Sequence, residues 1–411
     1  MLFPCTACDV GDPARCGKTN CPILAKYSGR TIKIEGKEEF QGTTPNVFVG
    51  RYGYPHIRAG ILSTEQYEQH DAPREWAAQN FNIPKIISLR QEMINSSFHV
   101  HVKGFSQRFL EMSQEIGMAV KPVDIEVKLN KKPVYRINYQ QEAAPHGPTL
   151  TLEKAQFLEN PKIPRPIDYV VSDTDLKATE AIGNLYQKGF DEQQLTKLLS
   201  IGTLGVKIER KLVPTRWSIT AVDDIIGKQV IENLQDYPEM GYQAYYGGYL
   251  GNYYLLLFFP GPWSYELFEM SADGNPHPKL WTDYESVFGR KTYASSTVGG
   301  YYACRHGILE KLDQLRRKAS VLALRFTTPE YTAPLGVWVC REATRKALSK
   351  QPLMLSGKEE MIQYAIRMLE HYKIDPSLLK QSKLLQEMNT QQRLGAEVGR
   401  TSSSQQRLDA F

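Results

Sequence analysis

The stretch YYLLLFF at residues 253–259 decides how the middle of this chain folds. Together with Pro260 it is the longest apolar run of the sequence. A run of this length suits a buried strand, and it is much shorter than the roughly 18 residues that span a bilayer. Pro260-Gly261-Pro262 is typical of a turn and leads into a second predicted strand at residues 265–270. We therefore expect two strands joined by a turn, and no membrane-spanning segment.

Helix and strand patterns both occur in the rest of the chain. Leu309, Leu312 and Leu315 mark an amphipathic helix, and Asp191 is placed to begin another. Further strands are predicted at residues 99–102, 123–127 (paired with 134–139), 206–213, 321–326 and 336–340. This mixture predicts an α+β fold.

Length and composition limit the number of domains. The 411 residues are too many for one small core and fit two or three domain-sized units. We expect an α+β core at residues 31–388, with a subdomain boundary near residues 160–170. The net charge of +5 permits contact with DNA without indicating it, because dedicated DNA-binding proteins concentrate basic residues on one face.

The first 30 residues carry four cysteines: Cys5, Cys8, Cys16 and Cys21. A Cys-x2-Cys pair places two thiolates on one tight turn, which is the usual first half of a tetrahedral zinc site. We predict a structural Zn²⁺ module at residues 1–30, and metal binding would supply on the order of 10 kcal/mol of its folding free energy. An iron–sulfur cluster and paired disulfides are the alternatives. Four thiolates leave no open coordination position, so this metal is not expected to be catalytic.

The other two cysteines, Cys304 and Cys340, stand alone and are expected in the core. A secreted disulfide scaffold would not leave so long a stretch nearly free of cysteine, and no signal peptide precedes Cys5. We therefore expect a cytoplasmic protein.

The last residues, 389–411, are polar and repetitive, and we predict a disordered, flexible tail there. Gln405, Leu408 and Phe411 are spaced i, i+3, i+6, which brings the leucine and phenylalanine to one face of a 3₁₀ turn. Peptides that dock on the DNA sliding clamp use such an apolar plug. The spacing alone carries little information, because a random sequence of this length matches it often. Its position at the final residue, after a polar tether, favours a clamp-binding peptide. No second aromatic residue follows, so we expect weak binding.

Residues 50–60 form a candidate DNA- or nucleotide-binding loop that combines three glycines with Arg51, Tyr52, Tyr54 and Arg58. Glycine lets the backbone approach a phosphate, arginine forks to it, and tyrosine stacks on a base. A structural loop with a partly buried arginine is the alternative.

Two later stretches also carry aromatic side chains. Arg216 and Trp217 follow Arg210 and Lys211, and they indicate either a second binding surface or a solvated strand edge. Residues 242–254 hold six tyrosines, which suit either a stacking platform for single-stranded DNA or packing within strands.

Signatures of catalysis are mostly missing: the sequence has no Walker loop, no Gly-x-Ser-x-Gly elbow and no His-Glu-x-x-His helix. His99 and His101 share one strand face and could bind a metal, although a packed or surface pair explains them as well. Asp223-Asp224 resembles the acidic strand ends that hold Mg²⁺ in nucleases, and helix capping is its simpler use.

Four blocks of sequence resemble the archaeal Nre family of DNA-repair proteins: the four-cysteine segment at residues 5–22, FVGRYGYP at 48–55, KLVPTRWSIT at 211–220 and the terminal 405–411. The resemblance covers essentially the whole chain. It implies a role in repairing DNA damage and an interaction with the sliding clamp PCNA. It supplies no agreed catalytic mechanism.

Three hypotheses follow. The first is a repair factor recruited through PCNA, whose core contacts DNA or other repair proteins. The second is an enzyme acting on nucleic acid or a nucleotide, with Arg51, Tyr54, Arg216 and Asp223 or Asp224 around one pocket. The third is a scaffold between the clamp and repair proteins that does not touch DNA, and salt-dependent DNA binding would separate it from the first two.

Overall fold

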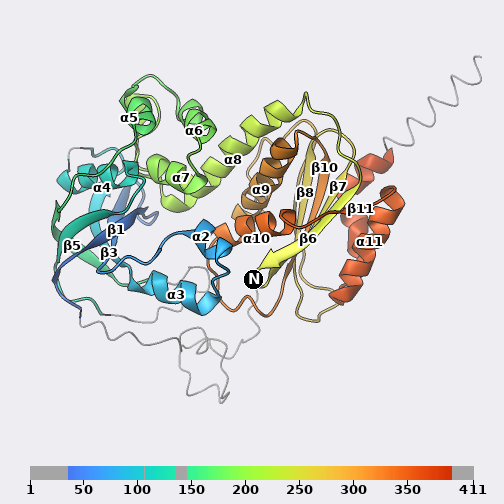
Figure 1. The fold of residues 1–411 in the computed structure, drawn as a ribbon, viewed down its shortest axis with the longest axis horizontal. Helices are drawn as coiled ribbons and strands as arrows, with labels where there is room; N and C mark the ends of the chain where they lie inside the picture. The colour runs from blue at the N-terminus through green and yellow to red at the C-terminus, as the bar shows by residue number, and fades with distance from the viewer. Residues whose placement is uncertain (1–35, 106, 135–145, 391–411) are drawn as a thin grey trace, which may run out of the picture. The chain divides into compact units, whose positions relative to one another are not determined.

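The computed structural model describes residues 36–105, 107–134 and 146–390 (Figure 1). The predicted zinc module at residues 1–30 and the predicted clamp peptide at residues 405–411 lie outside the described residues and stay predictions.

The chain divides into two compact units, of which the first comprises Met1–Val230 with Tyr331–Glu342 and the second Ile231–Glu330 with Ala343–Phe411. The position near residues 160–170 where we expected a boundary falls within the first unit. Helix α5, Arg165–Ser172, occupies that position.

Five strands of the first unit close into a barrel in the order β1-β2-β3-β5-β4. Neighbouring strands are antiparallel except β3 and β5, which run parallel. One helix, α4 (Arg108–Met118), separates β3 from β4 along the chain. This strand order and helix position are the topology of the OB-fold, a five-stranded Greek-key barrel. The strands are β1 (Glu39–Val49), β2 (His56–Thr64), β3 (Ile94–His101), β4 (Val123–Leu129) and β5 (Thr149–Phe157).

The alternation of side chains along each strand produces the barrel core. On β4, Val123, Ile125, Val127 and Leu129 are buried, whereas Asp124 between them is exposed. The same period of two places Ile57 and Ile61 of β2 inside the barrel, where both are fully buried. The prediction that β4 pairs with residues 134–139 is wrong, because β1 and β5 occupy both of its edges.

The helices of the first unit lie between the barrel strands and after them along the chain. Asp191 caps α7 as predicted, since its side chain accepts a hydrogen bond from the Gln194 backbone N–H. The strand predicted at residues 206–213 is wrong: the 3₁₀ helix η3, Lys207–Glu209, lies there. Trp338 lies in the segment Tyr331–Glu342, which belongs to the first unit although it comes late in the chain. Its ring packs edge-on against that of Trp76, with ring centroids 5.3 Å apart. The other helices of this region are α2 (Pro73–Ala78), α3 (Ile83–Glu92), α6 (Ala178–Gln187), α7 (Glu192–Ser200) and α8 (Thr215–Leu234).

The second unit is built on a six-stranded sheet in the order β11-β6-β7-β10-β8-β9. The run YYLLLFF lies in β7, and residues 265–270 lie in β8, as predicted. Pro260-Gly261-Pro262 joins these two strands along the chain, but β10 lies between them, antiparallel to β7 and parallel to β8. The strands are β6 (Gln243–Tyr249), β7 (Asn252–Phe259), β8 (Ser264–Ser271), β9 (Trp281–Glu285), β10 (Ser320–Thr327) and β11 (Leu353–Met354).

Helices cover both faces of this sheet (Figure 1). Helix α11 (Lys358–His371) packs on the face that carries Leu255 and Leu257, and these residues share one apolar cluster with it. Helix α9 (Gly299–Leu315) lies on the other face, where the rings of Tyr265 and Tyr301 are 4.9 Å apart. Burial on both faces explains why the run YYLLLFF in β7 is continuously apolar, without the alternation of apolar and polar residues seen in a half-buried strand.

Two further elements are α10 (Trp338–Leu348) and the 3₁₀ helix η4 (Pro376–Gln381), and residues 383–390 after them are also helical. The strand predicted at residues 336–340 is wrong, because these residues enter α10. None of the helices in the described part of the chain has the length and hydropathy needed to cross a membrane.

Candidate nucleic-acid interface

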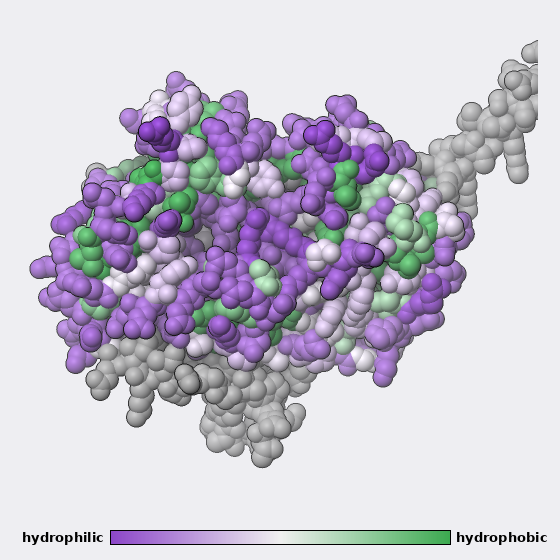
Figure 2. Space-filling view, in the orientation of Figure 1, coloured by the Kyte–Doolittle hydropathy of each residue, from purple (hydrophilic) through white to green (hydrophobic). Residues whose placement is uncertain are grey.

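The loop between β1 and β2 presents two aromatic rings to solvent. Its ends are held together by the Gly50 N–H, which donates to the Arg58 carbonyl at 2.7 Å. Gly53 has a φ of +79°, and a Cβ there would lie 2.6 Å from the His56 carbonyl oxygen, so this turn requires glycine. Tyr52 is 80% exposed and Tyr54 is 43% exposed. The surface visible in Figure 2 is mostly hydrophilic, with small hydrophobic patches.

Arg51 lies beside the first of these rings. Its guanidinium carbon is 5.2 Å from the centre of the Tyr52 ring, a cation–π arrangement, and its Nη2 donates to the Tyr52 hydroxyl at 3.5 Å.

The outward face of β2 and β3 carries a row of basic and imidazole side chains. The strand register places Arg58 opposite His99, and His56 opposite His101. Arg58 Nε donates to His99 Nε2 at 3.2 Å, and the His56 and His101 rings meet edge to face at 4.9 Å. The two histidines proposed as a metal pair do share one strand face. Their neighbours here are an arginine and a third histidine.

The first turn of α8 meets the loop between β1 and β2. The Val49 N–H donates to Thr215 Oγ1 at 2.9 Å, and the Leu212 N–H donates to the Val102 carbonyl at 2.8 Å. These bonds bring Trp217 to Tyr54, with ring centroids 5.5 Å apart and ring planes inclined by 50°. Trp217 is nevertheless 46% exposed. The two candidate clusters therefore form one surface.

The interpretation of Arg216 and Trp217 as a strand edge is wrong, because both lie in the first turn of α8. Arg210, grouped with them by sequence, has a structural role. Its guanidinium donates to the carbonyls of Gly205, Val171 and Asp173 at 2.7–2.9 Å.

The chain segments that build this surface contain no carboxylate. Aspartate and glutamate are absent from residues 40–64, 93–110 and 210–222. Within the described parts of the chain, Arg51, Arg58 and Arg216 form no ion pair. Exposed cations without acidic neighbours attract anions more strongly than paired ones do, because nothing neutralises their field. We define this surface as the barrel face, consisting of Arg51, Tyr52, Tyr54, His56, Arg58, His99, His101, Arg216 and Trp217.

The acidic pair proposed as a Mg²⁺ site is placed differently from the prediction. Asp223 and Asp224 lie inside α8, at neither a strand end nor a helix cap. Asp223 is buried, and Arg341 Nη2 donates to both of its carboxylate oxygens at 2.6 and 2.8 Å. Asp224 pairs with Lys228 one turn later at 2.7 Å. Asp223 also lies about 10 Å along the helix from Arg216, so it does not join the barrel face.

The tyrosine-rich segment serves packing instead of forming a stacking platform. Tyr245 and Tyr254 are buried, and the Tyr246 hydroxyl lies 2.6 Å from that of Tyr372 on the segment after α11. The Tyr372 ring stacks on Phe326 of β10 at 4.2 Å. These rings complete the apolar cluster between the sheet and α11.

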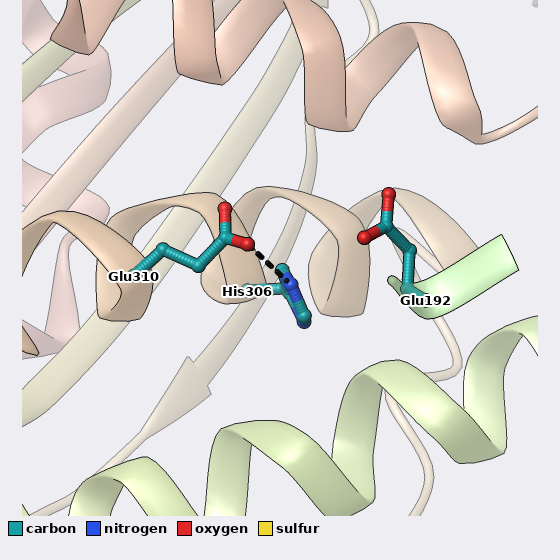
Figure 3. Close-up of side chains that lie close together, drawn as sticks. All are labelled: Glu192, His306 and Glu310. Carbon is teal, nitrogen blue, oxygen red and sulfur yellow. Dashed lines mark hydrogen bonds and ion pairs between the residues drawn. The ribbon is translucent and has the colours of Figure 1, made fainter. Parts of the chain in front are cut away.

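A polar group on α9 was missed by the sequence reasoning. His306 is buried one turn before Glu310, and its Nε2 lies 3.0 Å from the Glu310 carboxylate (Figure 3). Arg345 forks to the same carboxylate with two bonds of 2.8 Å. Burial alone would raise the pKa of Glu310, but the hydrogen bonds and charges of His306 and Arg345 hold it well below its usual range. Glu192, also labelled in Figure 3, belongs to the first unit, where it pairs with Arg74 at 2.6 Å.

The fold and the barrel face define an α+β protein whose first unit is an OB-type barrel with a candidate nucleic-acid interface. Residues 15–277 match the N-terminal sequence model of the archaeal Nre family, and residues 285–396 match the C-terminal one. The chain belongs to the archaeal Nre family.

Named relatives support this membership. The DNA repair protein NreA of Archaeoglobus fulgidus is 35% identical over 87% of this chain and 92% of its own length. NreB of the same organism, also a DNA repair protein, is 35% identical over 80% of this chain and 85% of its own. The DNA repair protein NreA of Haloferax volcanii is 34% identical over 76% of this chain and 79% of its own. No solved structure matches the fold.

Proposed function

We propose that this chain is a DNA-repair factor that works in the cytoplasm, is brought to DNA by the sliding clamp PCNA, and contacts DNA through the barrel face. The names of its relatives, each a DNA repair protein, support the repair role. The proposed clamp-binding residues are Gln405, Leu408 and Phe411. The proposed ligands of a structural Zn²⁺ are Cys5, Cys8, Cys16 and Cys21.

One observation carries the DNA-contact part of the proposal. Tyr54 and Trp217, which are 163 positions apart in the chain, meet on an exposed face whose arginines form no ion pair with any residue that the structure describes. Arginine side chains bind phosphate through a fork of N–H donors, and exposed aromatic rings offer a surface for bases. Leaving such residues partly in the open gains less stability than burying them fully would, because the stabilisation grows with the apolar area removed from water.

The DNA contact is tested by measuring the affinity of the full chain for labelled DNA over a range of salt concentrations. Each phosphate that an arginine neutralises releases counterions, so the affinity should fall steeply as salt rises. An affinity that does not change with salt, or no binding at low salt, would favour the scaffold hypothesis and contradict this part of the proposal.

The clamp contact is tested by a pulldown of PCNA with the full chain and with a Leu408→Ala/Phe411→Ala variant. Removing the apolar plug should abolish capture and leave the thermal unfolding of the chain unchanged, because the plug is proposed to bind the partner and not the core. A Ser403→Ala variant is the matched control. Equal capture by all three proteins would contradict clamp binding through this peptide.

A further inference from the structure

The topology of the first unit indicates where a ligand would lie on it. OB-folds bind oligonucleotides and oligosaccharides across their second and third strands, beside the loops that join strands one to two and four to five. In this chain the second and third strands carry Arg58 and His99, and the first of these loops carries Tyr52 and Tyr54. Fold alone does not establish function, so the chemistry of the side chains has to decide the ligand.

The charge of this face favours a nucleic-acid strand over a neutral sugar. Arg51, Arg58 and Arg216 carry fixed positive charges, and the chain segments around them lack aspartate and glutamate. Saccharide sites need acceptors as well as donors for hydroxyl groups, and carboxylates commonly supply them. A face without carboxylates is suited to a polyanion.

The aromatic rings distinguish a single strand from a duplex. A ring can stack only on a base whose flat face is open, and in duplex DNA neighbouring base pairs cover those faces. Tyr54 and Trp217 are about half exposed, and the inclination of 50° between their planes leaves each with its own accessible surface. Phe48, on the outward side of β1, is also 41% exposed. A duplex would contact this face through phosphates alone and would make no use of the rings.

We infer that the barrel face binds single-stranded DNA, with the phosphate backbone held by Arg51, Arg58 and Arg216 and with bases stacked on Tyr54 and Trp217. This inference rests on the proposed function and specifies the form of DNA that the same face takes. Binding is expected to tolerate different sequences, because every base has a flat face to stack.

The test compares an oligothymidine of about 15 nucleotides, within the usual site size of one OB-fold, with a duplex of the same length. Fluorescence anisotropy with the full chain should show at least tenfold tighter binding of the single strand. Tyr54→Ala and Trp217→Ala should each weaken single-strand binding by roughly tenfold and leave duplex binding unchanged.

Conservative variants keep the test falsifiable. Tyr54→Phe and Trp217→Phe retain a ring and should keep most of the affinity. Tyr169→Ala removes a tyrosine that is 68% exposed on α5 of the same unit and should have no effect. Thermal unfolding of every variant should match that of the parent chain, because the substituted rings are exposed.

The outcomes separate this inference from the proposed function. Equal or tighter duplex binding, or single-strand binding that survives both alanine substitutions, would overturn the inference. If the arginines of the barrel face are still needed for duplex binding, the proposed function stands and only the preference for a single strand is rejected. If neither form of DNA binds, both fail.

Discussion

The arginines of the barrel face differ in their pairing from arginines buried in the second unit. On the barrel face of the first unit, Arg58 and Arg216 are exposed and, among the described residues, have no acidic partner. In the second unit, Arg305 is buried and forms a bidentate pair with Glu285 at 2.7 and 2.9 Å. Arg325 is buried as well, with bonds to Glu269 and to the Asn252 side chain.

We infer from this difference that the pairing of the arginines, and not their number, marks the proposed binding surface. A buried arginine needs its carboxylate, because an uncompensated charge inside the protein is costly. An exposed arginine gains little stability from a surface ion pair, so leaving it unpaired costs little and keeps it available for a phosphate. The overall net charge of +5 averages over both situations.

The largest effect is expected from breaking a buried pair of the second unit. Glu285→Ala removes the partner of Arg305 and also the acceptor of the Tyr301 hydroxyl, 2.9 Å away. The loss should be about 3–5 kcal/mol of unfolding free energy, measured by urea denaturation. The double variant Glu285→Leu/Arg305→Met should recover much of it, because no charge stays buried. A loss below about 1 kcal/mol would mean that the buried pair contributes no more to stability than a surface pair does.

The next effect separates binding from stability on the barrel face. Arg58→Ala/Arg216→Ala should weaken DNA binding by about tenfold at moderate salt, equivalent to about 1.4 kcal/mol. The slope of log affinity against log salt should fall by about 1.4 for a single strand, since each lost phosphate contact removes about 0.7.

The unfolding free energy of this double variant should change by less than about 0.5 kcal/mol. Lys154→Ala, an exposed cation on β5 of the same barrel, is the matched control and should leave both quantities unaltered. A clear loss of unfolding free energy in the double variant would show that the two unpaired arginines stabilise the barrel. It would contradict the claim that they are available for binding at little cost in stability.

A smaller effect concerns acid stability of the first unit. His70 Nε2 lies 2.9 Å from Glu92, and this hydrogen bond lowers the pKa of the Glu92 carboxyl below its ordinary value of 4.5, although burial opposes the shift. A carboxyl group whose pKa is lowered by folding stabilises the fold at pH values above its pKa in the unfolded state. This stabilisation is lost as the pH falls through the pKa of the folded state. Glu92→Gln should therefore cost about 1 kcal/mol near neutral pH and show less further loss in acid, as followed by urea denaturation at several pH values. Parallel losses for both proteins across the acid range would contradict the role of this pair.

The smallest effect comes from the exposed pair on α8. Asp224→Ala removes a partner of Lys228 and should change the unfolding free energy by no more than about 0.5 kcal/mol. Its neighbour provides the contrast, because Asp223→Ala leaves Arg341 buried and should cost several times more. Similar thermal shifts for the two variants would show that burial does not control the strength of these pairs.

The sequence revealed most of the residues of the barrel face but not their meeting. Arg51, Tyr54 and Arg58 were identified because glycine, arginine and tyrosine together suit phosphate and base contacts. The approach of Trp217 depends on the hydrogen bond between Val49 and Thr215, which lie 166 positions apart. Such a contact follows from the tertiary packing of barrel and helix, and no local pattern predicts it.

The errors in secondary structure have a common physical cause. Residues 336–340 are apolar and include two β-branched valines, so over five positions they satisfy a strand pattern as well as a helical one. Gly336, with a φ of +105°, ends the preceding segment, and the α10 helix begins directly afterwards at Trp338. Asp223-Asp224 shows the same ambiguity, since two acids after Ala221-Val222 look identical at a strand end and within a helix.

The return of residues 331–342 to the first unit has a consequence for synthesis. The ribosome makes all five barrel strands and then five of the six strands of the other unit's sheet before it makes Trp338, which packs against Trp76, and Arg341, which binds Asp223. The unit that starts first is therefore completed only after most of its neighbour has been made. A fragment cut at residue 230 would expose the Trp76 indole and remove the Arg341 guanidinium from Asp223, so it should be less soluble and less stable than one that includes residues 331–342.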